Sequence, residues 1–167
     1  FNVQFVKTYA SNIAKAFIEK DKANEEYYKA NLESYTKKLD SLDSWIKTEI
    51  QKIPAEKRVL ITSHDAFRYF GKAYGLEVRG LQGISTEAKA QTEDVKKLID
   101  LIKERKLSSV FIETSVNPKL LEEISRETGA KVGGTLYSDS VGDEGTFEGT
   151  YIGAVTHNVN TIVNALK

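Results

Sequence analysis

Two polar side chains that bind metal ions in proteins stand at the ends of predicted strands of this chain. His64 lies at the carboxyl end of the strand predicted over residues 57–62, and Asp139 follows the strand predicted over residues 131–137. An imidazole nitrogen and a carboxylate oxygen suit zinc, manganese or iron. A stable metal site needs at least four donors. The pair therefore predicts half of a metal site, with the other ligands supplied from elsewhere.

Each of these side chains also has a plainer interpretation. His64 can form a hydrogen bond with nearby backbone only, and Asp139 can close an Asx-turn in its loop. Glu113, at the end of the third predicted strand, can hold His64 in one tautomer, pair with Arg79, or bind the metal directly. His157 is expected to face solvent, because it lies away from the apolar stripe of the last predicted helix.

The elements that position these residues follow from the spacing of apolar side chains. Before Pro54, helices are predicted over residues 1–20 and 21–53, and the second contains no Gly or Pro. After Pro54, short β-branched runs alternate with helical spacing, which is typical of an α/β fold with a four-stranded parallel sheet covered by helices on both faces. The strands are predicted over residues 57–62, 77–81, 108–113 and 131–137, and the helices over residues 65–74, 92–104, 117–129 and 150–166. Such sheets bind ligands at the carboxyl ends of their strands.

The composition argues against several classes of function. The 167 residues contain 24 Lys and Arg and 24 Asp and Glu, and this zero net charge argues against a nucleic-acid partner. The absence of Cys excludes a disulfide scaffold, a thiolate nucleophile and a cysteine-based zinc site. The sequence contains neither the glycine-rich motifs of nucleotide-binding loops nor the Gly-x-Ser-x-Gly motif of hydrolases.

Three functions are compatible with the pair formed by His64 and Asp139. The first is a binding module for a divalent metal ion. The second is a metal-dependent hydrolase that uses His64 and Asp139 as ligands around an open position, with Glu113 as the evident general base. The third is a structural role, in which amphipathic helices pair with another copy of the chain.

Five ordered motifs are similar to those of a known family. Residues 62–70 read TSHDAFRYF and residues 83–87 read GISTE; VFIET at 110–114, LYSD at 136–139 and GTY at 149–151 follow. In this order they resemble the C-terminal half of the manganese/zinc-class solute-binding proteins of bacterial ABC importers. The resemblance covers nearly the whole chain, and five motifs in order are far more specific than any one of them alone.

The resemblance implies two α/β lobes joined by one long rigid helix, with the metal ion between the lobes. Residues 21–53 would be the interlobe helix, residues 1–20 a helix left from the N-terminal side, and residues 54–167 the C-terminal lobe. His64 and Asp139 match the metal ligands of that lobe, whereas two His ligands come from the N-terminal lobe. The chain begins with Phe1 and not with Met. In the family, the stretch with the second of those His ligands would end just before this point, so both N-terminal ligands are expected to be absent.

The resemblance also implies a carrier and not an enzyme. Such a carrier captures a divalent metal outside the cytoplasm, as a lipid-anchored or periplasmic protein, and delivers it to an ABC permease. His at position 64, where manganese-specialised members have Glu, is shared with members that take zinc or manganese. Manganese (Mn2+) is favoured and zinc (Zn2+) is the alternative, because this half offers a carboxylate and no thiolate. The implied partners are the metal ion, the permease and the N-terminal lobe, and this chain alone is expected to bind metal weakly or incompletely.

Overall fold

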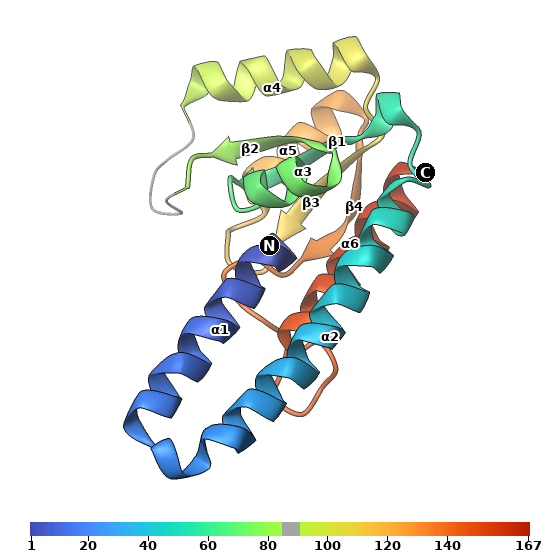
Figure 1. The fold of residues 1–167 in the computed structure, drawn as a ribbon. Coiled ribbons are helices and arrows are strands. Elements are labelled where there is room, and N and C mark those ends of the chain that lie inside the picture. Colours follow the sequence, from blue (N-terminus) through green and yellow to red (C-terminus); the bar gives the residue numbers. More distant parts are fainter. Residues whose placement is uncertain (85–90) are drawn as a thin grey trace.

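The computed structural model describes residues 1–84 and 91–167 and has the predicted α/β fold (Figure 1). Within these residues the sheet has four strands, all parallel, in the order β2-β1-β3-β4. The strands are β1 (Val59–His64), β2 (Glu77–Gln82), β3 (Ser109–Glu113) and β4 (Lys131–Leu136). The helices are α1 (Val3–Lys20), α2 (Glu25–Ile50), α3 (Arg68–Tyr74), α4 (Thr92–Arg105), α5 (Lys119–Thr128) and α6 (Tyr151–Leu166). The motif at residues 83–87 and the polar loop expected up to residue 90 lie, from residue 85 onward, outside the described residues.

The strand β1 lies in the interior of the sheet. All six of its residues are buried, because β2 and β3 flank the strand and helices cover both of its faces. Its side chains alternate between the faces: Leu60 packs in one part of the core, whereas Val59 and Ile61 pack in the other. The strand order reverses between β1 and β3. In sheets of this type that reversal places a ligand crevice at the carboxyl ends of the two strands.

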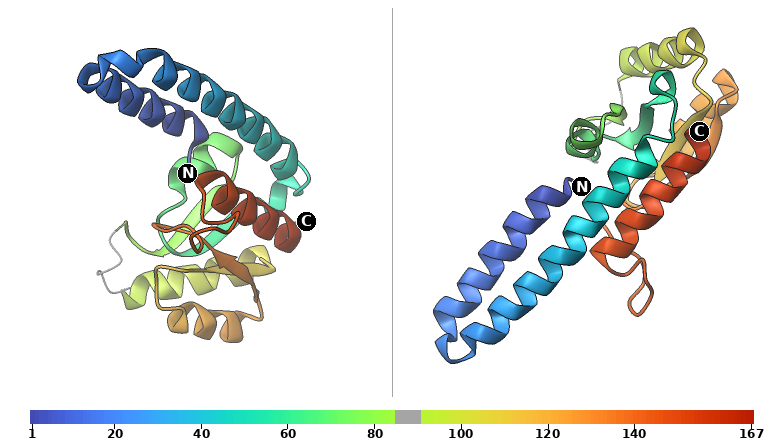
Figure 2. Two further views of the ribbon diagram at one scale, coloured as in Figure 1. Left: turned by 90° about the horizontal axis from the view of Figure 1, so that it is seen from below. Right: turned by 45° about the vertical axis from the view of Figure 1, so that its right-hand side comes forward.

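Two layers of helices enclose the sheet, which confirms the predicted covering of both faces (Figure 2). The helices α2, α3 and α6 pack on one face, around Phe111 of β3 and Leu136 of β4. The helices α4 and α5 pack on the other face, around Ile61 of β1 and Val110 of β3. Neighbouring residues of β3 thus serve opposite layers, as the two-residue period of a strand requires.

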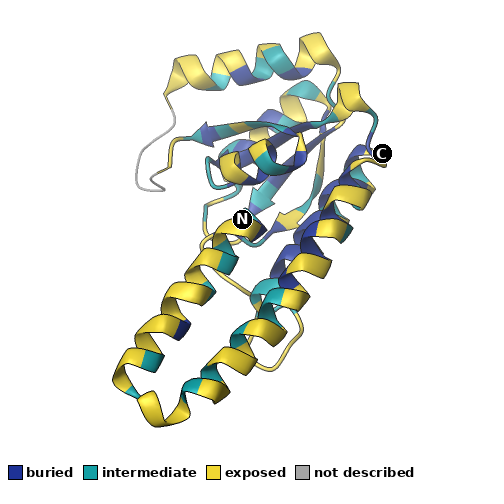
Figure 3. Ribbon diagram, viewed as in Figure 1, coloured by how far each residue is buried: buried dark blue, intermediate teal, exposed yellow. Residues whose placement is uncertain are grey.

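The helices α1 and α2 form an antiparallel hairpin that extends away from the sheet (Figures 1 and 2). Asp21 fastens its turn by accepting hydrogen bonds from the Asn24 amide and the Tyr28 hydroxyl, both at 2.8 Å. With 26 residues, α2 is about 39 Å long. Its buried residues begin at Leu39, and the far half of the hairpin is largely exposed (Figure 3). The helix observed in place of the one predicted over residues 21–53 is shorter. A 3₁₀ turn occupies Lys22–Asn24, and α2 ends at Ile50.

Several helix ends are formed by residue types that favour them. Asn2 caps α1 and Thr150 caps α6, each accepting a backbone N–H at 3.0 Å. Gly75 ends α3 in the left-handed region with φ of 81°. The helix α3 begins at Arg68 and not at the predicted residue 65. The N–H of Asp65 donates instead to the carbonyl oxygen of Gly83, after β2, at 3.3 Å. Among the described helices, none combines the length and the apolar character that crossing a membrane requires.

Candidate metal centre

The candidate residues lie together at the carboxyl edge of the sheet. His64 is the last residue of β1 and Glu113 the last residue of β3, so both stand at the crevice where the strand order reverses. Asp139 follows the next strand, β4, three residues after its end. His64 is 49 residues from Glu113 and 75 from Asp139 in the chain, yet it contacts both. Parallel pairing of the strands brings them to the same edge.

His64 is buried, and its polar groups face two carboxylates. The residue is 1% exposed. Its backbone N–H donates to Oε1 of Glu113 at 2.8 Å, and its ring Nδ1 lies 2.9 Å from Oε2 of the same side chain. On the other side of the ring, Nε2 lies 2.9 Å from Oδ2 of Asp139. Glu113 therefore holds both the backbone and the ring of His64, with Nε2 directed toward Asp139.

Glu113 contacts His64 and does not pair with Arg79. Its side chain is 0% exposed, whereas Arg79 pairs with Glu77 at 2.7 Å. Burial raises the pKa of the Glu113 carboxyl, and the Ser138 hydroxyl and the His64 contacts act in the opposite direction. Of the roles open to Glu113 from the sequence, this geometry supports the one in which it orients the His64 ring.

The orientation of the His64 ring decides which nitrogen is available to a metal ion. An ionised carboxylate accepts hydrogen bonds and cannot donate them, so Nε2 is the donor in its contact with Asp139. When a metal ion takes the place of that proton, the Glu113 carboxylate beside Nδ1 favours keeping the other ring proton on Nδ1, and Nε2 supplies the lone pair that coordination requires. The approach of Nδ1 to Oε2 is close but not aligned as a hydrogen bond, so Glu113 acts on the ring mainly through its charge.

Asp139 differs from His64 in exposure and in backbone conformation. Its side chain is 63% exposed. Its φ of 53° lies in the left-handed region, which few non-glycine residues adopt and which Asn and Asp tolerate best. The left-handed residue stands after the end of β4, and its carboxylate lies beside Nε2 of the His64 ring.

The two donor atoms are spaced like two ligands of one ion. Bonds of about 2.1 Å at angles between about 90° and 109° separate two ligands by about 3.0–3.4 Å. Nε2 of His64 and Oδ2 of Asp139 are 2.9 Å apart, so a small outward shift of either lets both bind one ion. Within residues 1–84 and 91–167, no group of three or more His, Cys, Asp and Glu side chains is arranged to hold a metal ion.

Comparison with known proteins agrees with this chemistry. Residues 1–165 match the model of the family described as ZnuA, zinc-uptake complex component A, periplasmic. The chain belongs to this family. The ZnuA match runs through both the helical hairpin and the sheet that carries His64 and Asp139.

Individual proteins that are similar to this ZnuA-family chain are named for zinc and for manganese. The zinc-binding protein TroA of Treponema pallidum is 48% identical over 139 residues, which are 80% of this chain and 45% of TroA. The manganese-binding lipoprotein MntA of Bacillus subtilis is 46% identical over 145 residues, 84% of this chain and 47% of MntA. The solved structure of periplasmic zinc-binding TroA matches with a TM-score of 0.96 at 40% identity, over 99% of this chain and 62% of that one. The chain thus spans about half the length of the curated relatives it matches.

The expectation that His157 of this ZnuA-family chain faces solvent holds only in part. His157 is partly buried and does not simply face solvent: its Nε2 lies 3.0 Å from the carbonyl oxygen of Thr135, and its ring packs against Tyr137. Helix periodicity cannot show the polar groups of a neighbouring strand, so it did not reveal these contacts of His157. Asp65, which precedes α3, forms an ion pair with Arg68.

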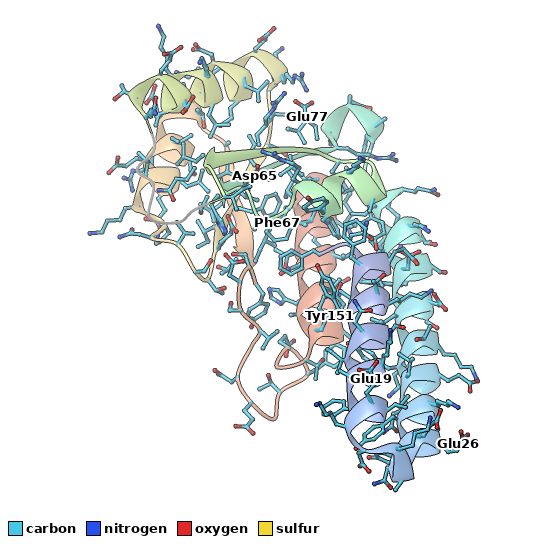
Figure 4. The ribbon with its side chains drawn as sticks, turned by 60° about the vertical axis from the view of Figure 1, so that its left-hand side comes forward. Glu19, Glu26, Asp65, Phe67, Glu77 and Tyr151 are labelled. Atoms are coloured by element: carbon cyan, nitrogen blue, oxygen red, sulfur yellow. The ribbon has the colours of Figure 1, made fainter. Side chains whose placement is uncertain are left out.

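The residues after His64 connect the site to the hairpin. Figure 4 shows Asp65 and Phe67 beyond the end of the sheet, close to the beginning of α1. The ring of Phe67 is buried and stacks on Phe1 with centroids 4.8 Å apart. In the same view Glu26 lies near the far end of the hairpin. The site is thus at the end where the hairpin meets the lobe.

Sequence reasoning missed the polar groups that hold the loop after β4. Thr114 and Ser115 follow β3, and their hydroxyls pair with serines on either side of Asp139. Asn158 of α6 holds the peptide groups of Tyr137. The available signals were a hydroxyl pair directly after a strand and one amide, Asn158, within the apolar stripe of the last helix.

Proposed function

We propose that this chain is the lobe of an extracytoplasmic metal carrier that supplies two ligands to a divalent transition-metal ion. His64 binds through Nε2 and Asp139 through its carboxylate, and the carrier delivers the ion to an ABC permease. The observation that carries the proposal is the 2.9 Å approach of these two donor atoms at the edge of the sheet, with the other ring nitrogen held against buried Glu113. Membership of the ZnuA family supports the transport role.

The ion we propose is manganese, with zinc as the alternative. One imidazole and one carboxylate suit both metals, and of two similar relatives one is named for zinc and the other for manganese. Extracytoplasmic location, as a lipoprotein or in the periplasm, is proposed from the same names.

The remaining ligands are proposed to come from an N-terminal lobe that belongs to the same protein. In this proposal residues 54–167 form the C-terminal lobe, residues 21–53 the connection between lobes, and residues 1–20 part of the N-terminal side. The exposed apolar side chains of α1 support a covering partner: they recur every four residues and each is about half exposed (Phe5, Tyr9, Ile13 and Phe17). For the chain on its own, self-association through this stripe is the alternative, which sedimentation at increasing concentration tests.

A carrier is favoured over a metal-dependent hydrolase by the position of Glu113. The hydrolase hypothesis needs a general base within reach of a metal-bound water. Glu113 is fully buried behind His64 and is engaged with its N–H and its ring, so it does not face the position that such a water would take.

The experiment is a titration of the chain with Zn2+ and with Mn2+, by calorimetry or by nuclear magnetic resonance. His64→Ala and Asp139→Ala are each expected to weaken binding by more than about tenfold, because the loss of a ligand exceeds the usual effect of outer-shell changes. His157→Ala is the matched control, because His157 is the other of the two histidines of the chain. It is expected to leave binding unchanged, since its Nε2 faces the carbonyl oxygen of Thr135. Unchanged affinity in both site variants would refute the proposal.

A further inference from the structure

The exposed donor of the site depends on neighbours for its position. Asp139 has a positive φ, a conformation that costs a non-glycine residue about 1 kcal/mol and persists only where the surroundings hold it. Its side chain is largely exposed, so packing around the carboxylate does not fix it. Apart from its contact with Nε2 of His64, the position of the carboxylate therefore depends on the groups that fasten the residues on either side of Asp139.

The first such group is the side chain of Asn158. It is 2% exposed, within the buried stripe of α6. Its Oδ1 accepts the backbone N–H of Tyr137 at 2.8 Å, and its Nδ2 donates to the carbonyl oxygen of Tyr137, also at 2.8 Å. Both peptide groups that flank Tyr137 are thereby held, two residues before Asp139.

Two hydroxyl pairs hold the residues next to Asp139. The hydroxyls of Ser115 and Ser138 lie 2.9 Å apart, and those of Thr114 and Ser140 lie 2.8 Å apart. The N–H of Thr114 also donates to the carbonyl oxygen at the end of β4 at 3.0 Å, so pairing of the two chain segments continues past the strands. Asp139 is thus bracketed by fastened residues on both sides.

These contacts connect the two donors of the site through one short segment. Glu113 holds His64, and the next two residues, Thr114 and Ser115, hold the serines on either side of Asp139. We propose that Thr114, Ser115 and Asn158 are positioning residues that fix the carboxylate of Asp139 against Nε2 of His64. None of the three binds the ion, and the proposal rests on the metal-binding function proposed above.

The test removes the hydroxyls without changing the shape of the loop much. Thr114→Val combined with Ser115→Ala deletes both pairs, and Thr114→Ser combined with Ser115→Thr is the rescue that keeps both hydroxyls. Ser125→Ala combined with Thr128→Val is the matched control, because it deletes two hydroxyls and their hydrogen bonds at the far end of α5. Asn158→Ala is a second variant, and His64→Ala tests the function itself. Each is titrated with Zn2+, while nuclear magnetic resonance follows the backbone shifts and relaxation of Asp139.

We expect the hydroxyl-deleted variant to bind Zn2+ about tenfold more weakly, at the lower end of the range for outer-shell partners. Its Asp139 amide is expected to become more mobile, while its melting temperature and its His64 resonances stay near those of the parent. The rescue variant and the α5 control are expected to bind like the parent, and Asn158→Ala to bind more weakly if it folds.

Unchanged Zn2+ affinity and an unchanged Asp139 amide in the hydroxyl-deleted variant overturn the inference, provided that His64→Ala abolishes binding; the proposed function then stands. Equal weakening in the α5 control also overturns it, because the effect would be general destabilisation. If His64→Ala leaves binding unchanged, the proposed function fails and the positioning role fails with it.

Discussion

Replacing Tyr74 by Phe tests how the hairpin is fastened to the lobe that carries the site. The Tyr74 hydroxyl, at the end of α3, donates to Oδ1 of Asp43 on α2 at 2.8 Å, and Lys47 donates to Oδ2 at 2.6 Å. Asp43 and Tyr74 are both buried. Burial alone would raise the pKa of Asp43, but the hydrogen bonds from Lys47 and Tyr74 hold it below its usual range. Burial also raises the pKa of Tyr74, so its hydroxyl remains a donor.

The expected change in the free energy of unfolding follows from the charge of the Asp43 carboxylate, which accepts the hydrogen bond. A hydrogen bond to a charged group contributes about 1.5–3 kcal/mol, whereas one between neutral groups contributes about 1 kcal/mol. Lys47 stays in place in the variant, so we expect Tyr74→Phe to lower the free energy of unfolding by about 2 kcal/mol near neutral pH. Because the folded pKa of Asp43 is depressed, its contribution is complete above the unfolded value of about 3.9 and is lost as the pH falls through the lower folded value. The difference between the two proteins should therefore shrink toward about 1 kcal/mol in acid.

The assay is urea unfolding at several pH values between neutral and acid, followed by the fluorescence of Trp45, the single tryptophan of the chain. Tyr69→Phe is the control, because Tyr69 lies on the same helix with an exposed side chain. A decrease in the free energy of unfolding below about 0.5 kcal/mol near neutral pH, or one that does not change with pH, would refute the reasoning. It would show that the hydrogen bond from Tyr74 to a charged Asp43 does not stabilise the fold.

Further predictions concern the site and the core. Glu113→Gln should weaken Zn2+ binding by about 10–100-fold in a calorimetric titration, because the amide no longer fixes the tautomer of His64; unchanged affinity would contradict the role given to Glu113. Gly153→Ala should destabilise the chain in urea by about 1–3 kcal/mol, although Ala normally favours a helix, because the new Cβ would collide with the backbone of Phe147; a gain in stability would contradict this packing. Phe111→Ala, at a fully buried position, should lower the unfolding free energy by about 3–5 kcal/mol, and a smaller loss would mean that the core collapses around the cavity.

The fold could be predicted because its signals are local. The run from Val59 to Thr62 is apolar and β-branched, and burial on both faces is what such a run requires. Gly75 and Thr150 mark helix ends through conformational and capping preferences that act within a few residues. The hairpin geometry of α1 and α2 was not predicted, because it depends on which apolar faces meet and on the hydrogen bonds of Asp21 across the turn.

The candidate site could be predicted only in part. His64 and Asp139 were identifiable because strand ends of a parallel sheet share one edge, and this holds for any sequence with that alternation. The choice of partner for Glu113 was not accessible, since it depends on strand order: β1 and β3 are neighbours, which places Glu113 beside His64 and not beside Arg79. The left-handed φ of Asp139 left no signal that separates it from an ordinary loop aspartate.

The two donors belong to parts of the chain that open with very different free energies. His64 ends an interior strand in which every residue is buried, and amides in such a strand exchange with solvent only through large-scale unfolding. The side chain of Asp139 is exposed beyond the edge strand β4. Of the two hydroxyl pairs beside it, Thr114–Ser140 is exposed, whereas Ser115–Ser138 is partly buried. His64 is therefore held by the core, whereas the turn with Asp139 can open locally while the core stays folded. Under the proposed function, release of the ion would begin at the Asp139 turn, before any larger part of the molecule moves.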